Sequence, residues 1–258
     1  MSLTPALASP ASPVIVTGGA SGIGLASAEA LASVGRPVAL WDIDSAKAAA
    51  AAEAIARSHG VAAVGIGIDL RNLDAIEAAL AATRQALGAP GGLVHAAGIV
   101  DTASLDGITA ESWDSGIAIH LRSLAFIVQA IRADLAARQG SAIVTIASIN
   151  ATLGNAVNPI YSAAKGGMLS LVRSLADRLA MDGIRINSVS PGQILTPMLR
   201  PTVEALPEGA FERRILLGRL GEPQEVARVV RFLLSDEASY VTASEIVVDG
   251  GNISSQRG

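Results

Sequence analysis

The stretch VIVTGGASGIG at residues 14–24 carries the first indication of the fold. Its opening residues predict a buried strand, and the glycines at 18, 22 and 24 follow as a turn that opens into a helix near 22–34. Glycines let the backbone turn tightly and approach a pyrophosphate, whose charge then faces the amino terminus of the helix. A glycine turn between a strand and a helix therefore predicts a dinucleotide site, and a tight turn without a ligand is the alternative.

The same succession of strand and helix repeats along the chain. Short apolar runs at 37–42, 61–69, 92–97, 141–148, 184–190 and 245–251 alternate with helical stretches near 45–59, 72–87, 111–138, 160–181 and 222–234. Continuously apolar runs are typical of strands that are covered on both faces. The alternation predicts an α/β fold of the Rossmann type, a doubly wound parallel sheet of about seven strands with helices on both faces. We expect one domain over residues 14–258, after a disordered lead-in at residues 1–13.

Composition limits the partners of the chain. Hydrophobic residues make up 50% and aromatic residues 3%, so the core must consist of aliphatic side chains. The net charge of −4 argues against a nucleic acid or an anionic membrane surface as partner. The chain has no cysteine, and its three histidines lack the spacing of a metal site, so no metal is expected. The amino terminus lacks the basic region of a secretory signal, and no apolar run approaches the ~18 residues of a membrane span, which predicts a soluble, cytoplasmic protein.

Asp42 ends the second expected strand, where a carboxylate meets the adenosine ribose hydroxyls of a bound dinucleotide. An acid at this point repels a 2′-phosphate, and no cation lies nearby in the sequence, so NAD is favoured over NADP. The alternative is that Asp42 or Asp44 only caps the next helix. Asp69 ends the third strand, and it either contacts the adenine edge or caps a helix.

Tyr161 and Lys165 are one of only two tyrosines and one of only two lysines in the chain. In a helix, a spacing of four residues puts both side chains on one face. A cation beside a phenol favours the phenolate and lowers the pKa of the phenol. The pair therefore predicts an acid/base group, and a coincidental pair on a helix surface is the alternative.

With TGGASGIG at 17–24, YSAAK at 161–165 and Ser148 thirteen residues before Tyr161, the chain resembles the short-chain dehydrogenase/reductases, in their compact single-domain branch. SPGQILTP at 190–197, GRLGEPQEVA at 218–227 and VVDGG at 247–251 support the resemblance, which extends from Val14 to Gly251. Three positions depart from the usual family pattern, and one of them is Ala243, where a glycine is common. HAAG at 95–98 stands where Asn-Asn-Ala-Gly is common, and His120 stands where an active-site asparagine is common.

The resemblance implies roles for particular residues. Tyr161 is the acid/base, Lys165 holds the ribose and lowers the pKa of the phenol, and Ser148 hydrogen-bonds the substrate oxygen. His120 joins the catalytic set as a candidate, and it is either a packed core histidine or a neutral group that relays a hydrogen bond. The residues expected to bind the cofactor are Gly18, Ser21, Gly22, Ile23, Gly24, Asp42, Asp69, Leu70, Ala97, Gly98, Tyr161, Lys165, Pro191, Gly192, Ile194 and Thr196.

The expected function is NAD(H)-dependent interconversion of a secondary alcohol and a ketone by hydride transfer. The expected substrate contacts are Ser148, Asn150, Asn155 and Tyr161. The asparagines suit a polyol and the neighbouring aliphatic residues suit a lipophilic ketone, so the small-molecule substrate stays open. Two other functions are considered, a 3-oxoacyl thioester reductase of fatty-acid synthesis, which usually draws on NADPH, and a non-catalytic cofactor-binding sensor. The resemblance also implies a homotetramer that uses the helices near 111–138 and 160–181.

Overall fold

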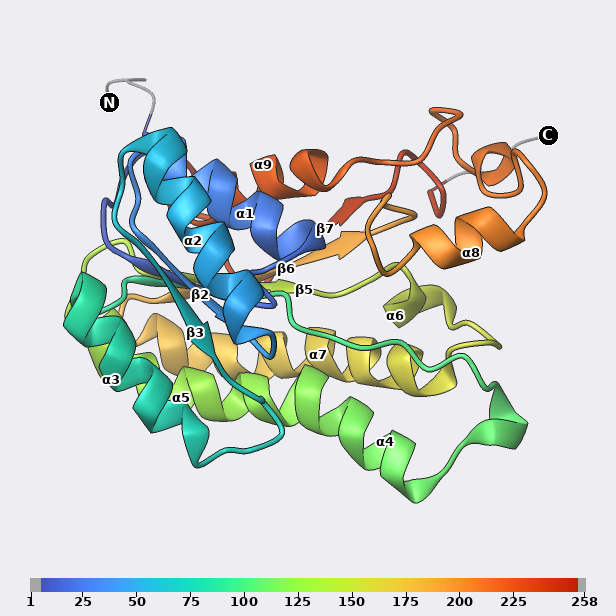
Figure 1. Ribbon diagram of the computed structural model, residues 1–258, viewed down its shortest axis with the longest axis horizontal. Coiled ribbons are helices and arrows are strands. Elements are labelled where there is room, and N and C mark those ends of the chain that lie inside the picture. Colours follow the sequence, from blue (N-terminus) through green and yellow to red (C-terminus); the bar gives the residue numbers. More distant parts are fainter. Residues whose placement is uncertain (1–5, 255–258) are drawn as a thin grey trace.

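The computed structural model describes residues 6–254, which form a parallel sheet between two layers of helices (Figure 1). The seven strands follow the spatial order β3-β2-β1-β4-β5-β6-β7, and every neighbouring pair is parallel. This sheet confirms the predicted doubly wound α/β fold. The strands are β1 (Val14–Thr17), β2 (Val38–Asp42), β3 (Ala63–Gly67), β4 (Gly92–His95), β5 (Ala142–Ile146), β6 (Arg185–Pro191) and β7 (Glu245–Val248).

Helices follow most of the strands, as the sequence predicts. The longer ones are α1 (Gly22–Ala32), α2 (Ser45–His59), α3 (Ala75–Leu87), α4 (Ala110–Ile117), α5 (Ser123–Ala136), α7 (Pro159–Ala180) and α9 (Pro223–Leu233). The helix expected near 111–138 is interrupted, because a π-helical turn at Ala118–Arg122 separates α4 from α5. Two short helices, α6 (Asn150–Leu153) and α8 (Arg200–Ala205), lie in segments for which no helix was expected.

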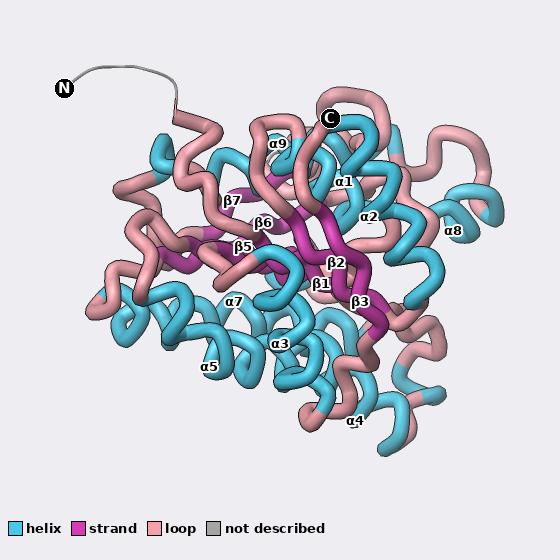
Figure 2. Tube along the Cα trace, turned by 60° about the vertical axis from the view of Figure 1, so that its left-hand side comes forward, coloured by secondary structure: helices cyan, strands magenta, loops and turns pink. Residues whose placement is uncertain are grey.

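Helices cover both faces of the sheet (Figure 2). Alternate residues of each central strand pack in two separate apolar cores, one on either face. In β1, Ile15 packs in the core under α3, α5 and α7, whereas Val14 and Val16 pack in the core under α1, α2 and α9. All three side chains are fully buried. Full burial of one aliphatic side chain contributes about 1.5–3 kcal/mol, so residues on both faces stabilise the central strands.

The strand order places the site. The chain leaves β1 through α1 toward β2 on one side, and it returns through α3 to β4 on the other side of β1. The connections therefore diverge on the two faces of the sheet, and the carboxyl ends of β1 and β4 border a crevice. In open parallel sheets, ligands bind in the crevice at such a reversal of strand order.

Residues 6–13 belong to the segment expected to be a disordered lead-in, and the structure gives them specific partners. The amide of Asp236 donates to Ser9 O at 2.8 Å, and the amide of Ala6 donates to Glu237 Oε1 at 2.9 Å. The buried guanidinium of Arg36 donates to Ser12 O at 3.1 Å. Buried donors need acceptors, which explains why this part of the segment is tied to the domain. Residues 1–5 of the expected lead-in and residues 255–258 of the expected domain lie outside the described residues.

The run Ala110–Ala136 is, within residues 6–254, the one helical stretch long and apolar enough to cross a membrane by length and composition. It comprises α4, the π-helical turn and α5, and Leu124, Ile127 and Ile131 are buried in the core under the sheet. Core helices of this kind pass the same length and composition test, so the run is weak support for a membrane span.

Candidate active site

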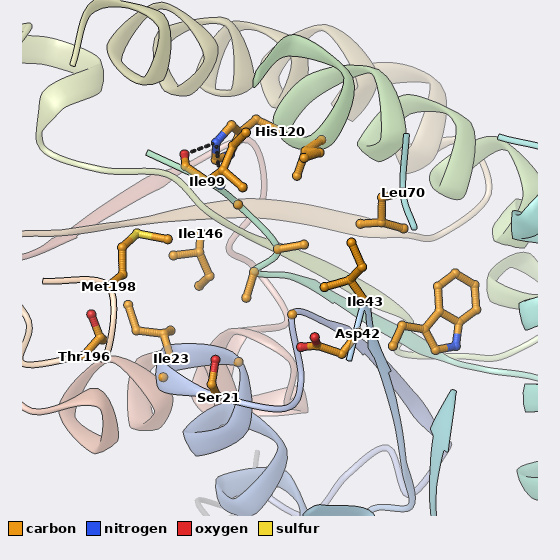
Figure 3. A pocket seen from close by; sticks show the side chains of 18 of the residues that line it. Ser21, Ile23, Asp42, Ile43, Leu70, Ile99, His120, Ile146, Thr196 and Met198 are labelled. Atoms are coloured by element: carbon orange, nitrogen blue, oxygen red, sulfur yellow. Dashed lines mark hydrogen bonds between the residues drawn. The ribbon is translucent and has the colours of Figure 1, made fainter. Parts of the chain in front are cut away.

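A cavity of about 290 Å³ lies at the carboxyl ends of the strands, between the glycine turn and α7. Figure 3 shows Ser21 and Ile23 of the glycine turn on one side of this cavity and His120 with Ile99 on the other. Most of the residues predicted to bind the cofactor or to act in catalysis meet here. Those that line the cavity are Gly18, Ser21, Gly22, Ile23, Gly24, Asp42, Asp69, Leu70, Ala97, Gly98, His120, Tyr161, Lys165 and Thr196.

The glycine turn is packed so tightly at Gly18 and Gly24 that neither position has room for a side chain. A Cβ atom at Gly24 would lie 2.1 Å from Gly18 O, and one at Gly18 would lie 2.8 Å from the Cα atom of Ala97. Gly18 and Gly22 also have positive φ angles of 64° and 54°. Helix α1 begins at Gly22, and the side chain of the N-cap residue Ser21 makes no capping hydrogen bond. The first amides of α1 are thus available to an anion, which fits a bound pyrophosphate.

Asp42 holds the glycine turn against the end of β2. Its Oδ2 accepts a hydrogen bond from the amide of Ala20 at 3.0 Å, and its Oδ1 accepts one from the amide of Asp44 at 3.1 Å. The cap of α2 is Asp44, whose Oδ1 accepts a hydrogen bond from the amide of Lys47 at 3.0 Å. The helix-cap alternative therefore applies to Asp44, while the carboxylate of Asp42 borders the cavity.

Asp69 is held by a neighbouring cation. Arg71 Nη2 lies 2.6 Å from Asp69 Oδ2, and this guanidinium holds the pKa of the carboxyl below its usual value. Asp69 lines the cavity, so its carboxylate borders the site as part of an ion pair with Arg71. The guanidinium of Arg71 is correspondingly committed to Asp69.

Tyr161 and Lys165 lie one turn apart at the start of α7. Lys165 is 3% exposed, and its Nζ donates a hydrogen bond to Ile146 O at 2.5 Å, at the end of β5. The same Nζ lies 5.5 Å from the centre of the Tyr161 ring. Helix α7 and strand β5 thus place an ammonium and a phenol together at the inner wall of the cavity.

Burial controls the protonation of this pair. It lowers the pKa of Lys165 to about 7 and raises the pKa of Tyr161, whereas a hydrogen bond with Ser148 acts to lower the pKa of the phenol. Removal from water disfavours the charged form of each group. In the protein alone, burial has the largest effect on the pKa of the phenol. The expectation that Lys165 lowers this pKa stays a prediction.

Ser148 and the predicted substrate asparagines lie outside the lining of this cavity. Ser148 follows β5, and its Oγ accepts a hydrogen bond from the amide of Asn150 at 3.1 Å, at the start of α6. Asn155 is exposed, and its Oδ1 accepts a hydrogen bond from the amide of Val157 at 2.9 Å, which forms a local turn. The structure therefore assigns the Asn155 carboxamide a structural partner within its own loop.

Three predicted cofactor residues lie behind the cavity. Pro191 ends β6, and the amide of Gly192 donates to Val248 O at 2.9 Å. Ile194 is 5% exposed and packs in the core under α1, α2 and α9. These residues support the segment that brings Thr196 against the glycine turn, where a Cβ atom at Gly22 would lie 3.5 Å from Thr196 Cγ2.

His120 lies in the π-helical turn with its ring against Tyr161. The ring centres are 5.4 Å apart, and the rings meet edge to face. His120 Nε2 lies 2.7 Å from Ile99 O and 3.2 Å from Ile99 N, and the shorter contact assigns Nε2 as the donor to the carbonyl. Among residues 6–254, the buried Nδ1 has no hydrogen-bond partner. The ring also fills the space beside Gly98, where a Cβ atom would lie 2.4 Å from His120 Cε1.

His95 fixes the backbone of this turn. Thr17 Oγ1 accepts hydrogen bonds from two amides, those of Ala96 and Ala97, so its own proton is free for His95 Nδ1 at 3.1 Å. His95 Nε2 is then the donor to His120 O at 3.2 Å. Burial lowers the pKa of His95 to about 3 and that of His120 well below its ordinary value, and the charge of Lys165 adds to both shifts. Both imidazoles are therefore neutral near pH 7.

Some lining residues were not predicted from the sequence. They are aliphatic or aromatic residues beside the predicted ones, namely Trp41, Ile43, Ile68, Ala96, Ile99, Ile119 and Ile146. Ile43 directly follows Asp42 at the end of β2, so its place in the sequence was a usable signal. Ile119 comes from a helical turn whose apolar residues look like any others, so the sequence offered no signal for it.

Comparisons with known proteins show similarity over most of the chain to dehydrogenases and reductases. The family profile described as enoyl-(acyl carrier protein) reductase matches residues 18–252. A probable galactose dehydrogenase, GalD, of Rhizobium meliloti (strain 1021) is 37% identical over 241 residues, which cover 92% of this chain and 93% of that protein. An L-rhamnose 1-dehydrogenase (NAD(P)(+)) of Azotobacter vinelandii is 36% identical over 243 residues, which cover 92% of this chain and 95% of that protein. The crystal structure of L-sorbose reductase from Gluconobacter frateurii, complexed with NADPH and L-sorbose, has a TM-score of 0.89 and 27% identity, and the match covers 95% of this chain and 97% of that chain.

The geometry of His120 leads to a prediction for its replacement by asparagine. A neutral imidazole near pH 7 is not a second general base, and the backbone carbonyl of residue 120 is kept in any variant. His120→Asn should therefore retain kcat/KM within about tenfold, a cost below ~1.4 kcal/mol. The measurement is kcat/KM for alcohol oxidation against pH, with His59→Asn, at an exposed histidine, as the matched control. A loss as deep as that of Tyr161→Phe, or the disappearance of an ionisation seen in the wild type, would show that His120 carries protons directly.

Proposed function

Because this chain belongs to the short-chain dehydrogenase/reductase family and interconverts a secondary alcohol and a ketone, we propose that Tyr161, Lys165 and Ser148 carry the reaction, with NAD as the cofactor. The observation that carries the proposal is the buried pair of Tyr161 and Lys165 at the inner wall of a cavity that the glycine turn borders. The paired phenol and ammonium suit proton transfer, and the turn suits a pyrophosphate.

The residues at hand fit a dinucleotide. The glycine turn leaves no room for a side chain at Gly18 or Gly24, and the first amides of α1 are available to phosphate oxygens. Asp42 borders the cavity at the end of β2. A bound nicotinamide dinucleotide supplies the acceptor or donor of the hydride. The chain itself then has to bind the substrate oxygen and move one proton.

Proton transfer falls to the phenol of Tyr161. In oxidation, the phenolate form accepts the proton of the substrate hydroxyl, and in reduction the phenol donates a proton to the carbonyl oxygen. Ser148 donates a hydrogen bond to the same substrate oxygen and stabilises the charge that develops on it. Lys165 supplies a nearby positive charge, which favours the phenolate when the ammonium is protonated.

The preference for NAD rests on the charge beside the ribose position. Asp42 contributes a carboxylate, and the guanidinium of Arg71 is paired with Asp69. A 2′-phosphate would therefore meet an unpaired negative charge. The L-rhamnose 1-dehydrogenase is named for NAD(P)(+), and the L-sorbose reductase structure is a complex with NADPH. The proposed preference for NAD therefore rests on this chain's own residues and not on its relatives.

The substrate is a secondary alcohol, and the relatives and the cavity favour two different chemical classes of alcohol. The relatives are named for galactose, rhamnose and sorbose, which supports a hydroxyl-rich substrate as the first candidate. The aliphatic side chains of Ile99, Ile146 and Met198 favour a lipophilic ketone as the second. Rates of NAD reduction with galactose, rhamnose, cyclohexanol and a hydroxysteroid separate the two classes, and the rate of reduction of a 3-oxoacyl thioester tests the remaining alternative.

The cofactor preference should depend on the charge of Asp42. We expect NAD to exceed NADP in kcat/KM by at least about tenfold, which corresponds to ~1.4 kcal/mol. Asp42→Asn keeps an oxygen for the amide of Ala20 and removes the charge, so it should narrow this ratio. Asp44→Asn removes the same charge two residues away and keeps a helix-capping side chain, so it serves as the matched control. Equal use of NAD and NADP by the wild type would refute the preference.

Replacement of the phenol tests the catalytic assignment. Tyr161→Phe should lower kcat by about 10² to 10⁴, the usual effect of losing a positioned acid/base, while the dissociation constant of NAD is unchanged. Tyr240→Phe is the matched control, because Tyr240 is the only other tyrosine and is fully exposed. Turnover by Tyr161→Phe close to that of the wild type would contradict the assignment.

The proposed assembly is a homotetramer. Only a few apolar residues of the two helices implied by the family resemblance are exposed and could form contacts between subunits. Many apolar residues of the two long helices are buried within the domain itself, namely Leu124, Ile127, Val128, Met168, Leu169 and Val172. Trp113 and Phe126 on α4 and α5 stay exposed, as does Tyr240. These side chains are the remaining candidates for contacts between subunits.

Light scattering at micromolar concentration tests the assembly. The expected mass is four times the 26.0 kDa of one chain. Phe126→Lys should lower this mass, because a charged side chain in an apolar contact between subunits is costly. Lys47→Glu, at an exposed position on the opposite layer, controls for a change of charge. A monomer mass for the wild type would reject the tetramer.

A further inference from the structure

The first turn of α7 is capped by a residue that lies 60 positions away in the sequence. The amides of Ile160 and Tyr161 donate to the two carboxylate oxygens of Asp101, at 3.2 Å to Oδ2 and 2.8 Å to Oδ1. Free amides at the start of a helix need acceptors, and a carboxylate there also meets the positive end of the helix dipole. Asp101 supplies both oxygens from the loop that follows β4.

The residue in the usual capping position does something else. Asn158 precedes α7, and its side chain makes no capping hydrogen bond to the helix. Its Nδ2 instead donates to the backbone oxygen of Asp101 at 2.5 Å. Asn158 therefore fixes the backbone of Asp101, and the carboxylate of Asp101 takes the place of a local cap.

The loop that carries Asp101 is anchored on both sides of it. Before Asp101, Ile99 O accepts a hydrogen bond from His120 Nε2 at 2.7 Å. After it, Ser104 Oγ donates to Ala156 O at 2.8 Å, on the segment that leads into α7. Asp101 thus lies in a braced loop, which links the π-helical turn of His120 to the first turn of α7.

We infer that Asp101 is a positioning residue for the phenol of Tyr161. The amide that its Oδ1 holds belongs to Tyr161 itself, so the hydrogen bond constrains the Cα position from which the ring extends. A displacement of a reacting group by about 1 Å can cost 10²-fold in rate. This inference goes beyond the proposed function and rests on it, because it takes Tyr161 as the acid/base.

Graded variants of Asp101 test the inference. Asp101→Ala removes both acceptors, and kcat should fall by about tenfold or more. Asp101→Asn keeps one oxygen for the amide of Tyr161, so its loss should be smaller. The dissociation constant of NAD should stay within about twofold of the wild type, since the cofactor turn is untouched. Asp106→Ala removes an exposed carboxylate further along the same loop, and it should behave as the wild type does.

A double variant separates positioning from general stabilisation. If Asp101 acts by placing the phenol, then Asp101→Ala should cost nothing further in a Tyr161→Phe background, because the group to be placed is gone. The assay uses NAD with whichever of galactose, rhamnose or cyclohexanol the wild type oxidises fastest, and thermal unfolding of each variant is followed alongside. Should Asp101→Ala fail to fold, the comparison is made with Asp101→Asn.

Three results would overturn the inference. The first is a kcat of Asp101→Ala within about twofold of the wild-type value. The second is a loss of NAD affinity in Asp101→Ala as large as its loss of kcat. The third is a kcat of the double variant that is lowered by the product of the two single effects. Full activity of Tyr161→Phe alone would instead refute the proposed acid/base, whatever Asp101 does. Failure of the proposed function and failure of this inference are therefore distinguishable.

Discussion

Burial of a lysine beside a tyrosine is the constraint on which the rest of the site depends. Within residues 6–254, the hydrogen-bond acceptor for Lys165 Nζ is the carbonyl of Ile146, and the phenol of Tyr161 lies beside it. Desolvation disfavours the ammonium and the phenolate alike, so the pKa of Lys165 falls to about 7 and that of Tyr161 rises. Near pH 7, the protein alone therefore keeps the phenol protonated and leaves the lysine about half protonated. On this account, proton transfer from an alcohol requires the charge of a bound cofactor to favour the phenolate.

The surroundings keep the pair in place with groups that do not titrate near neutrality. The imidazoles of His95 and His120 are both neutral, because burial lowers their pKa values, and each uses Nε2 as a donor to a backbone carbonyl. His95 fixes the π-helical turn, and His120 fixes the loop that carries Asp101. These contacts join β1, β4, α4, α5 and α7 around one phenol. Rigid, neutral supports of this kind hold geometry without adding an ionisation to the reaction.

The sequence predicted the sheet, most of the helices and most of the cavity, because these depend on local patterns. Continuous apolar runs and glycines at fixed spacing are visible in a few neighbouring residues. The second role of Asp42, which accepts a hydrogen bond from the amide of Ala20, was not visible, because it depends on how two strand ends meet. The same holds for Asp101 and for the π-helical turn that divides the helix expected near 111–138. The effect of burial on the pKa of Tyr161 was not visible either, because spacing reveals a neighbouring charge but not the depth of burial.

An ultraviolet difference titration of the phenol tests the central claim most directly. The chain has two tyrosines, and the variant Tyr161→Phe keeps only Tyr240. Subtraction of the variant's titration from that of the wild type therefore leaves the signal of Tyr161 alone. The account predicts that Tyr161 ionises above the ~10 of a free phenol in the protein by itself, and at least about one unit lower with saturating NAD. A pKa that is the same with and without NAD, or one already below ~10 in the protein alone, would contradict it.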